Sequence, residues 1–111
     1  MTDSAPYVVP TKTHSLATLE TYWDAVESGV KTFEVRRDDR GFQRGDVLLL
    51  RKLRRHGDYI NDAGLVTSHA EFAATLRARV SWILTGGQLG IEPGYVVMSL
   101  CDVCRVLETT N

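Results

Sequence analysis

One stretch of this chain has the hydrophobic spacing of a helix, and every later patterned stretch is strand-like. Four apolar residues recur at the i, i+3, i+4, i+7 spacing of an amphipathic helix, namely Leu19, Tyr22, Trp23 and Val26. Thr18 stands in a capping position and Gly29 where the chain turns, so we expect a helix from about Thr18 to Ser28. An early helix followed by strands predicts an α+β fold with a small, mostly antiparallel sheet, and 111 residues favour a partly closed β-barrel.

The later segments combine β-forming residues with turn residues between them. Strands are expected over residues 31–36, 47–50, 76–84, 95–100 and 103–107. Alternation in the first of these segments places Phe33 and Val35 toward the core. Trp82 falls on the alternating apolar face of a later strand, and Trp23 lies on the apolar helix face. We therefore expect both tryptophans in the core, with Phe42 closing one end of it.

The length predicts one domain, because two domains would each be too small to bury a useful core. Residues 1–10 have two prolines and no periodicity, which predicts a disordered lead-in to a domain over residues 11–108. Residues 56–74 are rich in glycine, asparagine and aspartate and predict a long excursion of the chain. Ser68 and Glu71 fit a capping box that opens a short helix within it.

Composition and charge restrict the possible partners. No apolar run approaches the ~20 residues of a membrane helix, and the start of the chain lacks the pattern of a signal peptide. We therefore expect a cytoplasmic protein without a membrane partner. The net charge of −1 gives no overall attraction to nucleic acid, yet eight cations lie between Arg36 and Arg55. This cluster fits either a solvated surface or a local anion-binding patch.

Cys101 and Cys104 form a Cys-x-x-Cys pair. A structural zinc site needs four ligands, and the other candidates are only the three histidines of the chain. A redox pair would open a helix, whereas Cys101 closes a predicted strand. The sequence therefore predicts two reduced cysteines, no metal and no cofactor.

The densest group of chemically useful side chains is Lys31, Glu34 and Arg36. Lys31 follows the predicted helix end, while Glu34 and Arg36 project from one face of a strand, so the three charged groups can converge in a cleft beside the helix. They offer a cation for phosphate or carbonyl, an acceptor for an exocyclic amine and a planar donor fork. The same spacing also fits an exposed Lys–Glu–Arg ladder without function.

These residues carry a resemblance to a known family. The pattern Gly29-x-Lys31-x-x-Glu34-x-Arg36 is similar to the G-x-K-x-x-E-x-R signature of the ASCH domain, a branch of the PUA-like superfamily. Further blocks in the same order resemble the bacterial and phage DUF3850 family, at residues 31–36, 39–40, 42, 45–48 and 94–100. The resemblance covers about residues 12–100, apart from an insertion at about 56–74, and implies a small β-barrel with one N-terminal helix beside a cleft.

The resemblance implies three possible functions. The first is binding of RNA, or of a nucleotide or modified nucleoside, around Lys31, Glu34 and Arg36. The second is hydrolysis, because some ASCH relatives resemble ribonucleases and one removes the acyl group of N4-acetylcytidine; Lys31 and Glu34 would then be catalytic. In that amidohydrolase a threonine stands at the place of Glu34, and Glu34 suits a binding lysine better than a nucleophilic one. The third is a protein-interaction module of a phage or mobile element.

Further candidate ligand-binding residues come from other segments. Phosphate contacts are expected from four arginines, Arg40, Arg51, Arg54 and Arg55. His14 lies in the presumed first strand and is either a contact or general base in the cleft or a hydrogen-bonded structural residue. Tyr95 is a candidate for stacking on a base.

Overall fold

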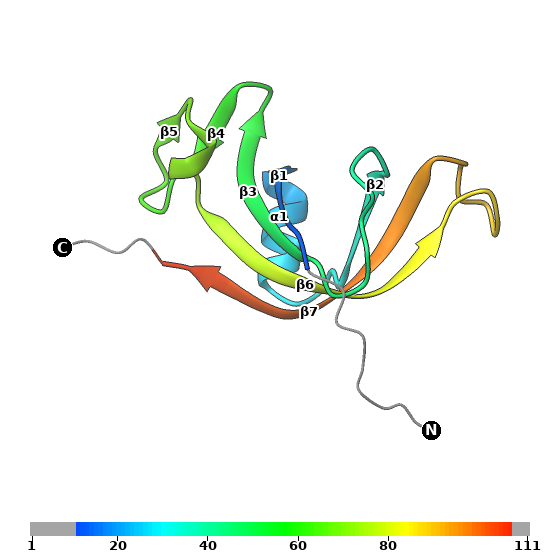
Figure 1. The fold of residues 1–111 in the computed structure, drawn as a ribbon. Helices are drawn as coiled ribbons and strands as arrows, with labels where there is room; N and C mark the ends of the chain where they lie inside the picture. Colours follow the sequence, from blue (N-terminus) through cyan, green and yellow to red (C-terminus); the bar gives the residue numbers. More distant parts are fainter. Residues whose placement is uncertain (1–10, 108–111) are drawn as a thin grey trace.

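Seven strands form one strongly curved sheet around a helix in the part of the chain that the structure, a computed structural model, describes, residues 11–107 (Figure 1). The helix is α1 (Glu20–Glu27), and a short 3-10 helix, η1, spans Ala70–Phe72. The strands are β1 (Thr13–Leu19), β2 (Phe33–Arg37), β3 (Val47–Arg55), β4 (Asp58–Ile60), β5 (Val66–Thr67), β6 (Thr75–Thr85) and β7 (Tyr95–Val106). The predicted lead-in, residues 1–10, lies outside the described residues.

The strand order leaves β1 and β2 as two edges of the sheet. The order is β2-β7-β6-β3-β4-β5, and β1 adds to β3 as the one parallel pair in a sheet that is otherwise antiparallel. Within residues 11–107, β1 pairs only with β3 and β2 only with β7. A mostly antiparallel α+β fold is thus confirmed, and the sheet stays open between β1 and β2.

The helix is shorter than expected at its start. β1 runs directly into α1, Leu19 occupies the N-cap position, and no side chain caps the helix there. Thr18 is not the cap, because it is a buried residue of β1 whose hydroxyl donates to the carbonyl of Leu16. The predicted end is confirmed: Gly29 has φ +86°, and its N–H donates to the carbonyl of Val26.

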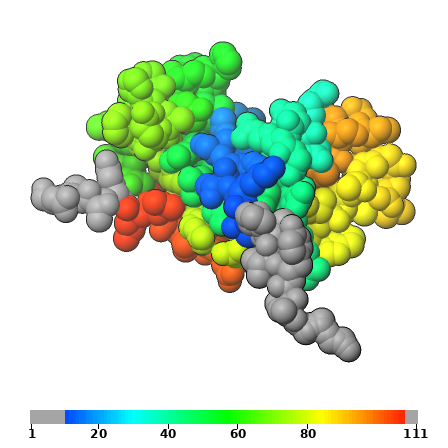
Figure 2. All heavy atoms as spheres, in the orientation of Figure 1, coloured from blue at the N-terminus to red at the C-terminus, as the bar shows by residue number. Residues whose placement is uncertain are grey.

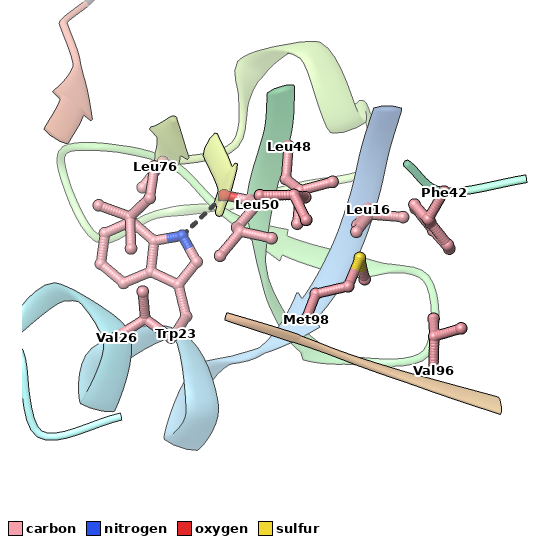
Figure 3. Close-up of a cluster of buried hydrophobic side chains, with 11 residues drawn as sticks. Leu16, Trp23, Val26, Phe42, Leu48, Leu50, Leu76, Val96 and Met98 are labelled. Atoms are coloured by element: carbon pink, nitrogen blue, oxygen red, sulfur yellow. Dashed lines mark hydrogen bonds between the residues drawn. The ribbon is translucent and has the colours of Figure 1, made fainter. Parts of the chain in front are cut away.

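The core lies between α1 and the concave face of the sheet (Figure 3). Trp23 is fully buried, and its indole N–H donates to the carbonyl of Leu50 in β3 over 2.8 Å, which fixes the helix to the sheet. Phe42 is buried at the end of this cluster, as the sequence predicted. The other large members are Leu16, Val26, Leu48, Leu50, Leu76, Val80, Val96 and Met98.

The orientation predicted for β2 is wrong. Phe33 and Val35 are 43% and 49% exposed, and Glu34 between them is only 3% exposed. Alternation is present, but the charged side chain points inward because β2 is an edge strand whose inner face meets two cations instead of the apolar core.

The core position predicted for Trp82 is also wrong. The ladder between β6 and β7 shifts register between Val80 and Trp82, as a β-bulge does. The extra residue reverses the alternation, so Trp82 is 55% exposed and the next residue, Ile83, packs against the core.

The excursion at residues 56–74 contains β4, β5 and η1, so the short helix expected there is present only as a 3-10 turn over Ala70–Phe72. η1 has three residues, and neither Ser68 nor another side chain caps it. The predicted strand over residues 103–107 is the far part of β7. Across residues 11–107, α1 and η1 are both too short to span a membrane.

Candidate functional site

A cleft of about 550 Å³ opens between the free edges of β1 and β2, beside α1. Its floor consists of side chains that point inward from both strands, and its rim consists of outward-pointing residues of the same strands. The lining residues are Ala17, Thr18, Leu19, Tyr22, Lys31, Phe33, Glu34, Val35 and Arg36. A volume of this size accommodates a small organic ligand.

The carboxylate of Glu34 is at the centre of the floor and is held by two cations. Lys31 Nζ lies 2.9 Å from Glu34 Oε1, and Arg36 Nε lies 3.0 Å from Glu34 Oε2. Both contacts are charge-assisted hydrogen bonds, which offset the cost of burying the carboxylate. The three residues that the sequence placed in one cleft therefore do lie together, and their formal charges leave a net positive charge.

The helix end positions Lys31. After Gly29 reverses the chain, the N–H of Lys31 donates to the carbonyl of Ala25 over 3.0 Å, which places the lysine beside the last turn of α1. Its ammonium also donates to the carbonyl of Phe33 and lies 4.8 Å from the centre of the Phe33 ring. The Tyr22 ring lies on another side of the ammonium, at 5.6 Å. Backbone and aromatic contacts thus hold the charge at the cleft.

Arg36 connects the two edges of the open sheet. Its Nη2 donates to Thr18 Oγ1 in β1 over 3.0 Å, while its Nε is bound to Glu34 in β2. Sequence analysis missed Thr18 and Tyr22 as cleft residues, because their positions fitted a helix cap and an apolar helix face. No local signal identifies Thr18, since its partner is 18 residues away in the chain.

His14 does not line the cleft and is the hydrogen-bonded structural residue of the two alternatives. It is buried, and its Nε2 lies 2.8 Å from Asp46 Oδ2. Burial raises the pKa of Asp46, but hydrogen bonds from His14 and from the N–H groups of Lys12 and Gln43 outweigh it and hold that pKa below its ordinary value. The pair joins the start of β1 to the turn before β3.

The four arginines expected to contact phosphate lie in two places. Arg40 donates to the Ser15 carbonyl and Arg51 to the Ser15 hydroxyl, so both lie against β1 outside the cleft. The segment containing Arg40 lies beside β1 in the space-filling view (Figure 2). Arg55 pairs with Asp58 at the far end of β3, where Arg54 is exposed. The sequence cluster is therefore not one continuous patch around the cleft.

Tyr95 and the cysteines also lie away from the cleft. The Tyr95 hydroxyl accepts a 3.3 Å hydrogen bond from Arg37, whose guanidinium lies over the ring. Cys101 and Cys104 are free thiols within β7, so neither opens a helix. Residues 11–107 contain no group of three or more histidine, cysteine or acidic side chains that fits a metal ion.

Residues 13–100 match a family described as a domain of unknown function, DUF3850. This chain belongs to the DUF3850 family. No curated protein matches this DUF3850 domain. The match runs from the start of β1 into the first half of β7 and contains the whole cleft, so the site is built from residues of the family domain.

Proposed function

We propose that this DUF3850 domain binds RNA, or a nucleotide or modified nucleoside, in the cleft between β1 and β2. The observation that carries the proposal is the ion triad on the cleft floor, in which one buried carboxylate fixes two cations. Preorganised charged donors in a concave site favour a polar, partly anionic ligand over a purely apolar one.

The two cations have donors to spare. An ammonium has three N–H groups. Lys31 donates one to Glu34 and one to the Phe33 carbonyl, which leaves one free. A guanidinium has five, of which Arg36 uses one on Glu34 and one on Thr18. The free donors suit phosphate or carbonyl oxygens. Tyr22 and Phe33, half-exposed on the rim, add faces on which a base can stack.

We also propose that the chain is an ASCH domain and that its fold is a PUA-like barrel. The signature residues have separate roles that support it: Gly29 ends α1, Lys31 follows that turn, and Glu34 and Arg36 form the floor. A gap in the sheet bridged by the Arg36–Thr18 hydrogen bond is compatible with a partly closed barrel. We expect such a domain to act in the cytoplasm.

Binding is tested by titrating the full chain with the four ribonucleosides, their 5′-monophosphates, and matched short RNA and DNA oligonucleotides. We expect saturable RNA or nucleoside binding that weakens with salt when phosphates are present. Arg36→Ala should weaken it at least about tenfold, because the guanidinium donors left free for a ligand are lost. Arg54→Ala removes the same charge outside the cleft and is the matched control. Absence of any saturable binding would reject the proposal and favour a protein-interaction module.

Hydrolysis in the same cleft is separated from binding by Lys31→Arg. The Lys31 ammonium contacts Glu34 and a carbonyl oxygen, and an ammonium has no lone pair with which to attack a substrate. Under the binding proposal the arginine variant keeps most affinity, and mass spectrometry finds no product from N4-acetylcytidine or RNA. Turnover by the wild type that Lys31→Arg abolishes would establish the hydrolase instead.

A further inference from the structure

The walls of the cleft are two open strand edges, and their backbone groups are the basis of this inference. In a strand, successive residues direct their N–H and C=O groups to opposite sides. The N–H of Leu100 donates to Thr32 and that of Asp38 donates to Gly94, so even-numbered residues of β2 bond to β7. Odd-numbered residues of β2, including Val35, therefore direct their backbone groups toward the open edge.

The same alternation applies to β1. The N–H of Val47 donates to the Lys12 carbonyl, so even-numbered residues of β1 bond to β3. Odd-numbered residues, including Ala17, direct their backbone groups toward the cleft. Two side-chain contacts agree with this assignment, because the outward carbonyls of Ser15 and Phe33 are the ones that Arg40 and Lys31 bind.

The positions of these two contacts define what is left for a ligand. Ser15 and Phe33 precede Ala17 and Val35 by two residues, and a cation already occupies each of their carbonyls. Ala17 and Val35 line the cleft, and their outward backbone groups have no hydrogen-bond partner in the described part of the chain. Each edge therefore offers the cleft the N–H and the C=O of one residue, a donor and an acceptor side by side.

We propose that these two backbone amides pair with the polar edge of a planar heterocycle such as a nucleobase. The inference rests on the proposed function and names the recognised part of the ligand: adjacent donor and acceptor groups on a ring edge, which every base carries. An extended peptide adding to β1 or β2 needs a row of free amides. The contacts at Ser15 and Phe33 interrupt that row, which favours a ring over a strand.

The geometry also orients such a ring. Its polar edge lies between Ala17 and Val35, its remaining polar groups face Glu34 and Arg36 on the floor, and its substituent points out past the rim. A cyclic amide or urea without a sugar satisfies the same contacts, so the ring edge, not ribose, supplies the recognition.

The experiment removes the amide donor by proline substitution. An edge strand tolerates proline where the N–H faces away from the ladder, so Val35→Pro and Ala17→Pro keep the pairing of β2 and β1. Thr13→Pro removes an outward-facing N–H of β1 at a residue that does not line the cleft, and it serves as the matched control. Each variant is checked by circular dichroism and titrated with the tightest-binding ribonucleoside and with its derivative methylated on the Watson–Crick edge.

We expect folded Val35→Pro and Ala17→Pro to bind the ribonucleoside about tenfold more weakly than wild type, with Thr13→Pro within about twofold. The methylated nucleoside should also bind wild type about tenfold more weakly than the unmodified nucleoside. In Val35→Pro and Ala17→Pro, methylation should cause little further loss of affinity, because both changes remove the same contact. In amide hydrogen exchange, the ligand should protect Ala17 and Val35. If Val35→Pro or Ala17→Pro fails to fold, the other variant and the methylated ligand decide the question without it.

Wild-type affinity in every folded proline variant, or equal binding of the methylated nucleoside, would overturn the inference. Joint protection of Phe33, Val35 and Arg37 would also overturn it, because it indicates an added strand. These outcomes differ from failure of the proposed function. In that case the wild type binds no nucleoside at all, whereas failure of this inference alone leaves nucleoside binding sensitive to Arg36→Ala.

Discussion

Two buried carboxylates, Asp46 and Glu34, show how similar ion pairs can serve different ends. Asp46 is surrounded by donors of the fold itself: His14 and the N–H groups of Lys12 and Gln43. Glu34 is surrounded by Lys31 and Arg36, whose remaining donors face a cleft. The first carboxylate connects segments and leaves nothing for a ligand. The second holds two cations that have donors to spare.

Removal of Asp46 should give the largest loss of stability. Asp46→Ala leaves two backbone N–H groups and His14 without their acceptor in a buried position, and we expect unfolding free energy to fall by about 3 kcal/mol. Urea unfolding measures it. Nucleoside affinity of the folded variant should stay within about twofold of wild type. A large loss of affinity at unchanged stability would reverse the roles assigned to the two carboxylates.

Acid should weaken the Asp46 contacts specifically. The pKa of Asp46 is lowered in the folded protein from an ordinary value of 3.8. Between the two pKa values the unfolded chain binds more protons, so this contribution to stability is present above pH 3.8 and is lost as pH falls through the folded pKa. The stability difference between wild type and Asp46→Asn should therefore shrink between pH 7 and pH 2. A difference that stays constant would contradict this pKa direction.

Glu34→Gln should lower stability less than Asp46→Ala does, and it should lower nucleoside affinity more than Asp46→Ala does. Glutamine keeps the shape, but its single carbonyl oxygen accepts from only one of the two cations, so we expect about 1 kcal/mol of lost stability. Lys31 and Arg36 would lose their fixed positions, and nucleoside affinity should fall about tenfold because preorganisation is lost. Calorimetric titration beside urea unfolding separates the two effects. Equal affinity with reduced stability would make Glu34 a purely structural residue.

Sequence patterns predicted elements better than they predicted which way the elements face. The spacing around Trp23 and the turn at Gly29 gave the helix, and Lys31, Glu34 and Arg36 were placed together because strand parity is local. Parity does not say which face is inner, so Phe33 and Val35 were assigned to the core although the edge strand directs Glu34 inward.

Other features depend on partners far along the chain. Trp82 is exposed because a bulge against β7 reverses the alternation, and the sequence of β6 alone does not reveal it. The His14–Asp46 pair spans 32 residues and the Arg36–Thr18 hydrogen bond spans 18, so neither follows from local spacing. The open edges that form the cleft follow from the strand order, which the sequence pattern did not specify.

The most direct test of a ligand-binding role for the Glu34 site is a comparison of Lys31→Ala with Lys12→Ala. Both remove one lysine charge, but Lys31 lines the cleft and Lys12 is an exposed residue outside it. We expect Lys12→Ala to change the unfolding free energy by less than about 0.5 kcal/mol. Lys31→Ala should lower it by about 1 kcal/mol, because buried Glu34 loses one of its two cations. Nucleoside or RNA binding should be lost in Lys31→Ala and kept in Lys12→Ala. Wild-type binding by folded Lys31→Ala would show that the ion triad is not part of a binding site.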